Sequence, residues 1–166
     1  MKKSILAYVV FAIISANQIA AQDQTIKKDN FETKHSIGFG AGYSTGVGIS
    51  YRYVPKRFGA QITFGLYVSE KQENYSNGFS LLYKLKSTNK STLFLYQGNH
   101  VVINRYFGFG DPTGYTYMHS LGIGIEINLL RDIGFNIMSG FLRQSDGRGS
   151  KPNFGPTLDL GLYYKF

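Results

Sequence analysis

The residues best suited to chemistry stand closest together in the stretch MHSLGIGIE, which holds His119, Ser120 and Glu126. A serine nucleophile, a histidine base and an acidic partner are the components of a hydrolytic triad. The stretch alternates apolar with small or polar residues, however, which predicts a β-strand. Neighbouring residues of a strand face opposite sides, and Glu126 would lie roughly 20 Å along the strand from Ser120 at about 3.3 Å per residue. The pattern therefore favours a histidine on one face and a serine on the other over a catalytic site.

Other patterns that could carry chemistry are equally weak. Glycines recur in GFGAGYSTGVG, but a phosphate-binding loop must lead into a helix. The even spacing of Gly38, Gly40 and Gly42 instead places these glycines on one face of a strand. The three histidines lack metal-ligand spacing, and the sequence contains no cysteine. We therefore predict no catalytic, cofactor-binding or metal-binding residues, and no cofactor.

Period-2 alternation recurs in eight segments between turn signals. They cover residues 36–43, 47–53, 58–68, 77–85, 92–103, 117–129, 133–142 and 157–166. The connections SEKQENYS, NRYFGFGDPTG and RQSDGRGSKPNFG are long, whereas VPKR and LLRD are short. Long loops at one end and tight turns at the other are typical of outer-membrane barrels.

The two faces of the predicted strands differ in composition. In the segment 117–129, one face carries Leu121, Ile123, Ile125 and Ile127, and the other carries small or polar residues. A soluble barrel would need lysine and glutamate on its second face, whereas small polar residues suit the narrow interior of an eight-stranded barrel. We therefore predict an all-β fold, an eight-stranded antiparallel up-and-down transmembrane β-barrel, with its apolar face toward lipid.

Charges follow the same division. The charged residues inside the predicted strands all lie on the small-residue face: Arg52, Lys84, Glu126, Asp159 and Lys165. An unpaired ion in so narrow an interior is strongly disfavoured. We therefore expect Glu126 to bridge Arg52 and Lys84.

Asp159 lies near the other end of its predicted strand. We expect it to meet a loop cation, either Arg143 or Arg105, and the four residues Arg52, Lys84, Glu126 and Asp159 to form a charge cluster in the lumen. Because side chains fill an interior of this size, we predict a plugged lumen that does not conduct.

The N-terminus carries an export pattern. Lys2 and Lys3 precede an apolar run from Ile5 to Ile14 that is too short to cross a bilayer as a helix. We predict a signal peptide at residues 1–21, a short periplasmic segment at 22–34 and the barrel at 35–166, in the outer membrane. The net charge of +8 in an exported protein favours anionic lipid or polysaccharide as partners over nucleic acid.

The segment LDLGLYYKF completes the pattern, because Leu160, Leu162, Tyr164 and Phe166 share one strand face up to a terminal aromatic. The chain resembles the small eight-stranded outer-membrane β-barrels of Gram-negative bacteria, the OmpA-like transmembrane type. The resemblance implies that these four residues act as an assembly signal read by the barrel-assembly machinery. It also implies contact with outer-membrane lipid and lipopolysaccharide.

We predict a non-enzymatic, structural or surface-interaction role through extracellular loops, with an unknown extracellular ligand or surface. The candidate contact residues are Glu70, Lys71, Glu73, Tyr75, Arg105, Tyr106, Phe107, Phe109, Tyr115, Arg143, Arg148 and Lys151. One alternative is a lipid A-modifying hydrolase, since the outer-membrane deacylases resemble this chain in size and strand number. A second alternative is a narrow, porin-like channel or a carrier of a small ligand.

Overall fold

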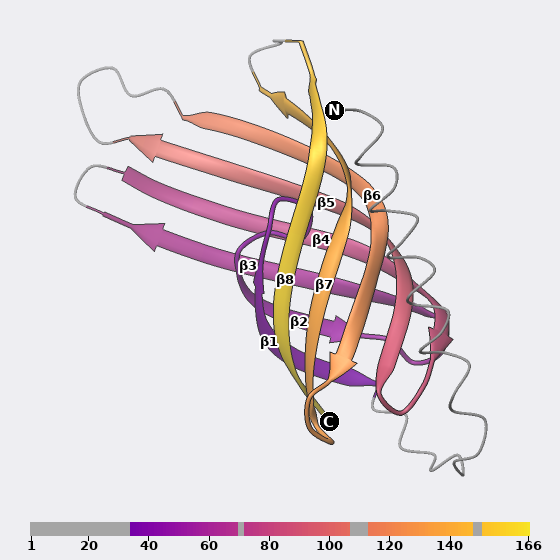
Figure 1. Cartoon of the computed structure of the whole chain (residues 1–166). Coiled ribbons are helices and arrows are strands. Elements are labelled where there is room, and N and C mark those ends of the chain that lie inside the picture. The colour runs from indigo at the N-terminus through magenta and orange to yellow at the C-terminus, as the bar shows by residue number, and fades with distance from the viewer. Residues whose placement is uncertain (1–33, 70–71, 107–112, 148–150) are drawn as a thin grey trace, which may run out of the picture. The chain divides into compact units, whose positions relative to one another are not determined.

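The computed structural model describes residues 34–69, 72–106, 113–147 and 151–166, and the predicted signal peptide and most of the predicted periplasmic segment lie outside these ranges. The described chain forms eight strands (Figure 1): β1 His35–Ala41, β2 Gly48–Tyr53, β3 Phe58–Val68, β4 Gln72–Ser87, β5 Ser91–Tyr106, β6 Gly114–Asn128, β7 Ile133–Asp146 and β8 Asn153–Lys165. Each strand pairs antiparallel with the next, and β8 pairs with β1 to close the barrel. The predicted fold class is confirmed. Among the described residues there is no helix long and apolar enough to span a membrane.

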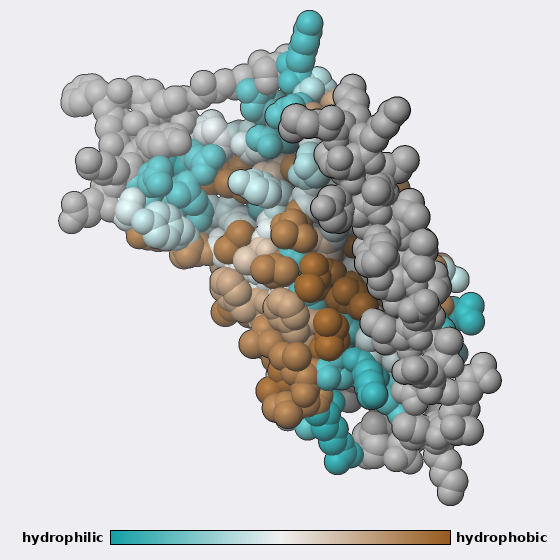
Figure 2. Space-filling view, in the orientation of Figure 1, coloured by the Kyte–Doolittle hydropathy of each residue, from teal (hydrophilic) through white to brown (hydrophobic). Residues whose placement is uncertain are grey.

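Residues that alternate along the sequence point alternately out of the barrel and into its interior. On β6, Leu121 is 66% exposed and Ile123 is 47% exposed, whereas Ser120 and Glu126 are 5% and 8% exposed. Figure 2 shows hydrophobic side chains gathered over the middle of the visible barrel wall, with hydrophilic residues toward its ends. The predicted assignment of the two faces is therefore confirmed.

The seam of the barrel lies at the C-terminal strand. The backbone N–H of Phe166 donates to the carbonyl of His35 at 3.0 Å, and the rings of these two residues stack with centroids 5.8 Å apart. Pairing then continues from Ser36 with Lys165 to Ala41 with Leu160. The alternation that ends on Phe166 thus serves the closure of the barrel.

The strands differ in length more than the sequence pattern indicates. β1 and β2 have 7 and 6 residues, whereas β4 and β5 have 16 each. The prediction that residues 69–76 form a long loop is wrong, because β4 already begins at Gln72. Pairing of Glu73 with Arg105 continues the sheet there, and the Tyr75 hydroxyl donates to the Glu73 carboxylate at 3.1 Å. Polar residues that face water on both sides of a strand give no alternation, which is why the sequence pattern stops short.

Many of the residues predicted to lie in extracellular loops lie within strands instead. Six of them lie within strands: Glu73, Tyr75, Arg105, Tyr106, Tyr115 and Arg143. Lys151 is exposed in the connection before β8. Five lie outside the described residues: Glu70, Lys71, Phe107, Phe109 and Arg148. The end of the barrel away from Phe166 is therefore formed in part by strand ends, such as those of β4 and β5.

Candidate functional site in the barrel interior

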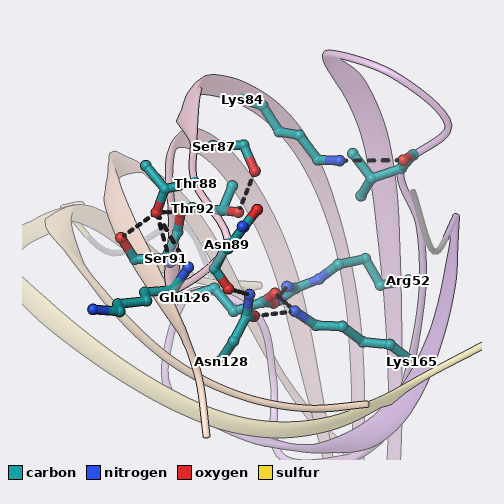
Figure 3. Close-up of polar contacts among 12 residues, drawn as sticks. Arg52, Lys84, Ser87, Thr88, Asn89, Ser91, Thr92, Glu126, Asn128 and Lys165 are labelled. Atoms are coloured by element: carbon teal, nitrogen blue, oxygen red, sulfur yellow. Dashed lines mark hydrogen bonds and ion pairs between the residues drawn. The ribbon is translucent and has the colours of Figure 1, made fainter. Parts of the chain in front are cut away.

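An ion cluster occupies the end of the interior near Phe166, where β8 ends. Glu126 on β6 forms ion pairs with Arg52 on β2 at 2.6 Å and with Lys165 on β8 at 2.5 Å (Figure 3). Arg52 also donates to the side-chain oxygen Oε1 of Gln61 through Nε at 3.1 Å and through Nη2 at 2.8 Å. Its guanidinium lies 4.1 Å from the centroid of the Tyr163 ring. Each charged group thus has the opposite charge or the polar partner that a buried ion requires.

The predicted bridge is half right. Arg52 is a partner of Glu126 as expected, but the second ion pair is with Lys165 and not with Lys84. The Lys84 ammonium donates to the carbonyl oxygen of Val54 at 3.5 Å and attracts Glu126 only at longer range. Figure 3 shows Lys84 apart from the Arg52–Glu126–Lys165 cluster. Lys165 reaches Glu126 across the intervening strand β7, where Gly134 leaves room: a Cβ on Gly134 would lie 2.9 Å from Lys165 Cε and 3.1 Å from Glu126 Cδ.

The cluster is tied to the turn between β4 and β5. Lys165 donates to the Asn128 side-chain oxygen at 2.5 Å, and the Asn128 amide donates to the carbonyl oxygen of Asn89 at 2.7 Å. Thr88 accepts the backbone N–H of Ser91 at 3.0 Å within that turn. Hydrogen bonds therefore connect the interior charges to the rim of the barrel.

Asp159 has a different partner from the one predicted. Its carboxylate accepts the backbone N–H groups of Ser44 at 3.1 Å and Thr45 at 2.9 Å, and the Thr157 hydroxyl at 3.1 Å. The expected loop cations are elsewhere. Arg143 lies on the exposed side of β7, and the Arg105 guanidinium lies over the Tyr75 ring. The prediction of a loop cation is therefore wrong, because the turn between β1 and β2 folds into the interior and brings its N–H groups to the carboxylate.

We call residues 43–47 the turn segment. Ser44 and Thr45 are 0% and 2% exposed, which places this turn inside the barrel. Its two ends are held by one pair of side chains from β4 and β5. The Val47 N–H donates to Ser76 Oγ at 2.9 Å, and the Tyr43 carbonyl accepts a hydrogen bond from His100 Nδ1 at 3.0 Å.

Glycines on the facing wall make room for the turn segment. A Cβ added at Gly65, Gly78 or Gly98 would overlap the carbonyl oxygen of Val47, Thr45 or Ser44 respectively. These glycines come from β3, β4 and β5 in turn. Gly46 itself has a φ of 88°, a conformation that favours glycine. The turn segment thus spans the interior from Asp159 on one side to three glycines on the other.

Sequence reasoning missed the turn segment. The spacing of Gly38, Gly40 and Gly42 predicts a lumen-facing strand, but it does not indicate that the following residues fold into the barrel. A signal did exist, because small residues recur on the inward face of several strands at once. That signal does not say which segment fills the space they leave.

Large side chains fill the rest of the interior. Tyr96, Met138 and Tyr163 are each 1% exposed, and Phe94 is 3% exposed. The Tyr163 hydroxyl donates to Ser50 Oγ at 3.3 Å. The inward faces therefore build a packed core around the turn segment and the ion cluster.

The candidate triad is not assembled. His119 is exposed and Ser120 is buried, so they face opposite sides of β6, and Glu126 belongs to the ion cluster. The structure does bring another serine and histidine together, with Ser76 Oγ 2.9 Å from His100 Nε2. Because a carbonyl only accepts, Nδ1 of His100 carries the proton, and Ser76 donates to Nε2 while it accepts from Val47. Both side chains are thus engaged in holding the turn segment.

Polar side chains from β5, β6 and β7 lie next to one another on the outer wall. The Gln97 amide donates to Asn99 Oδ1 at 3.1 Å, and His119 Nδ1 lies 2.9 Å from the same oxygen. Arg143 is paired directly opposite His119 across β6 and β7. Arg143 lies beyond the predicted end of its strand, and because β7 extends to Asp146 the structure adds this charge to the outward face.

Comparisons with known proteins identify the fold. No protein-family model matches the chain, and no curated protein matches it. The N-terminal β-barrel domain of OprF from Pseudomonas aeruginosa is similar in structure, with a TM-score of 0.51 and 11% identity over 78% of this chain and 95% of that one. Neisserial surface protein A gives a TM-score of 0.48 with 15% identity over 80% of this chain and 94% of that one. Ail, the attachment invasion locus protein of Yersinia pestis, gives 0.43 with 18% identity over 80% and 96%.

Proposed function

Because the chain has the fold of the small eight-stranded outer-membrane β-barrels, we propose that it is an integral outer-membrane protein with a closed lumen and a role at the cell surface. The outward face carries the proposal. Every strand exposes large apolar side chains there, including Phe39, Ile49, Phe64, Leu81, Leu95, Leu121, Phe141 and Leu158. An apolar surface that encircles a barrel needs a lipid environment, because soluble monomers rarely expose more than a few hundred Å² of contiguous apolar surface.

The proposed role is non-enzymatic. Inside the barrel, His100 and Glu126 could act as bases, but both are engaged in structure: His100 holds the turn segment together with Ser76, and Glu126 neutralises two cations. The packed interior also favours a closed barrel over a channel or a small-ligand carrier. The surface available to a partner is then the extracellular end of the barrel, where β4 and β5 bring Glu73, Tyr75 and Arg105 together.

The proposal includes a route to the membrane. Residues 1–21 would direct export and be removed, which leaves residues 22–34 in the periplasm. The barrel-assembly machinery would then recognise β8 by its outward row Leu160, Leu162, Tyr164 and Phe166. All four side chains are exposed on the barrel wall, where the assembly machinery could contact them.

Cell fractionation with gel mobility tests this function. We expect the protein in the outer-membrane fraction, with a mobility that differs between boiled and unboiled samples. Purified protein in planar bilayers should give no stable channel openings. Recovery from the periplasm without detergent would exclude an integral membrane barrel. Stable porin-like conductance would contradict the closed lumen and indicate a role in transport.

A charge placed on the outward face tests its contact with lipid. Ile123→Arg should lower the free energy of unfolding in lipid vesicles by roughly 2–4 kcal/mol, because Ile123 faces outward in the middle of the β6 apolar run. Ser145→Arg is the control, since Ser145 lies on the same wall near the far end of β7, where the cost is roughly 0–1 kcal/mol. Equal losses measured by denaturant titration would mean that this face does not meet hydrocarbon.

A further inference from the structure

The wall of the barrel has a gap at the end away from Phe166, and we call it the wall gap. Among the described strands, β8 has no partner on its β1 side at residues 153–159, and β3 has none on its β2 side at residues 65–68. Figure 1 shows β8 continuing well past the hairpin of β1 and β2. The edges of β3 and β8 therefore border the place where β1 and β2 would continue, while the turn segment lies inside the barrel.

The two edges of the wall gap lie beside apolar surface. Phe154 and Leu158 on β8 and Leu66 on β3 point outward and are 71%, 60% and 54% exposed. Backbone N–H and C=O groups without partners are costly at the level of lipid, which is why membrane barrels close completely. Pro156 lies in the unpaired part of β8 and has no N–H, as is typical of an edge strand. A segment that paired with these edges would remove the cost.

The turn segment has the register and the side-chain pattern to fill the wall gap. The pairing of β2 with β3, continued beyond its last pair, places Val47 opposite Leu66 and Thr45 opposite Val68. Strand alternation puts these four side chains on the outward face, where Leu66 and Val68 are already exposed. Gly46 lies between Thr45 and Val47 and gives the backbone freedom to change direction. The same residues can therefore form an inward turn or a continuation of the wall.

Polar contacts hold the turn segment in its inside position. The Asp159 carboxylate accepts the N–H groups of Ser44 and Thr45. The two large apolar side chains of the segment, Tyr43 and Val47, remain 62% and 47% exposed, so little apolar burial holds it there. In the wall gap, the backbone groups of the segment would bond to strand edges instead. Each position thus offers these groups different partners, as a two-position element requires.

We propose that the turn segment is a lid that alternates between the interior and the wall gap. Inside, it covers the Asp159 carboxylate. In the wall gap, it extends the β1–β2 hairpin and opens the end of the lumen away from Phe166. Phe94, Met138 and Tyr163 continue to fill the interior, so the open lid exposes a vestibule and not a channel. The inference rests on the membrane location proposed above and adds an interior surface that is reachable only when the lid is open.

A pair of introduced cysteines tests the lid, because the chain contains no cysteine of its own. In the inside position, the Thr45 carbonyl lies against Gly78, which pairs with Thr63 of β3. Val68 is five residues further along β3, roughly 17 Å at about 3.3 Å per residue. A disulfide joins Cα atoms that are at most about 7 Å apart. Thr45→Cys with Val68→Cys should therefore form a disulfide only when the lid is in the wall gap.

The measurement uses the full mature barrel in lipid vesicles under mild oxidation. Loss of free thiols over time, with a monomer band on a non-reducing gel, reports the disulfide within one chain. We expect it to form in the Thr45→Cys/Val68→Cys pair, and at least tenfold faster when Asp159→Asn is added, because this change removes the charge from the hydrogen bonds that hold the lid inside. Ser50→Cys with Val68→Cys is the matched control. Ser50 is fixed in β2 opposite Thr63, so this pair should form no disulfide within the chain.

The possible outcomes separate the lid from the proposed function. The absence of a disulfide between positions 45 and 68, even with Asp159→Asn, would overturn the lid. Equally fast disulfide formation in the control pair would also overturn it, since the whole barrel would then be opening. A boiled/unboiled mobility shift in each variant confirms that it is folded. If that shift and the outer-membrane location persist while no disulfide forms, the lid fails and the proposed function stands.

Discussion

Replacement of Glu126 by alanine should lower the free energy of unfolding by roughly 3–5 kcal/mol, because it removes the carboxylate shared by two buried cations. The side chains of Arg52 and Lys165 are only 6% and 14% exposed, so water cannot fully replace the lost charge. Urea unfolding in lipid vesicles, followed by tyrosine fluorescence, measures the loss. The variant should still give no stable conductance, because Tyr96 and Tyr163 continue to fill the interior.

Two control variants accompany this prediction. One removes a carboxylate near the surface, and the other separates the effect of charge from that of volume. Glu73→Ala removes a half-buried carboxylate at the far end of β4 and should cost about 1 kcal/mol or less, as is usual for carboxylates near the surface. Glu126→Gln keeps the volume but not the charge and should cost nearly as much as Glu126→Ala. If Glu126→Gln were as stable as the wild type, the ion cluster would not stabilise the barrel.

Asp159→Ala should cost roughly 3–6 kcal/mol, because it leaves two backbone N–H groups of a buried turn without their acceptor, at about 1.5–3 kcal/mol for each hydrogen bond to a charged group. The turn segment should then detach from its wall. Hydrogen exchange measured residue by residue should show the amides of Ser44 and Thr45 exchanging faster, while the strand amides of β6 and β7 remain protected.

Asp159→Asn is the control for this prediction. It keeps one acceptor oxygen for the turn and should lose markedly less stability than Asp159→Ala. A complementary change on the opposite wall is Gly78→Ala, whose Cβ would overlap the Thr45 carbonyl and push the turn segment from the other side. Protected Ser44 and Thr45 amides in both Asp159→Ala and Gly78→Ala would contradict the position of the turn inside the barrel.

The sequence alone predicted the strands, their two faces and the closure of the barrel. This was possible because alternation is a local property: each pair of neighbouring residues must face opposite sides of a strand. On β6, the separation of Leu121 and Ile123 from Ser120 and Glu126 could be read directly from their spacing. The same local rule predicted that His119 and Ser120 cannot act together, and the structure places them on opposite sides of the wall.

Contacts across the interior were decided only by the tertiary structure. Arg52 meets Glu126 as predicted, but the choice of Lys165 over Lys84 depends on the space that Gly134 of the intervening strand β7 leaves between Lys165 and Glu126. The strand ends beyond the apolar band also escaped prediction, because polar residues facing water on both sides lose the alternation on which the reading depends. Arg143, which the sequence pattern places in a loop, therefore lies within β7 on the outer wall.

The turn segment is the clearest case of what the sequence left undetermined. Asp159 and the Ser44 N–H that it accepts are separated by 115 residues, and nothing in the local pattern of either strand indicates the other. Gly65, Gly78 and Gly98 could be assigned to an inward face, but the segment that fills the space beside them could not. Local alternation determines which way each side chain points. What it meets there depends on the register and closure of all eight strands together.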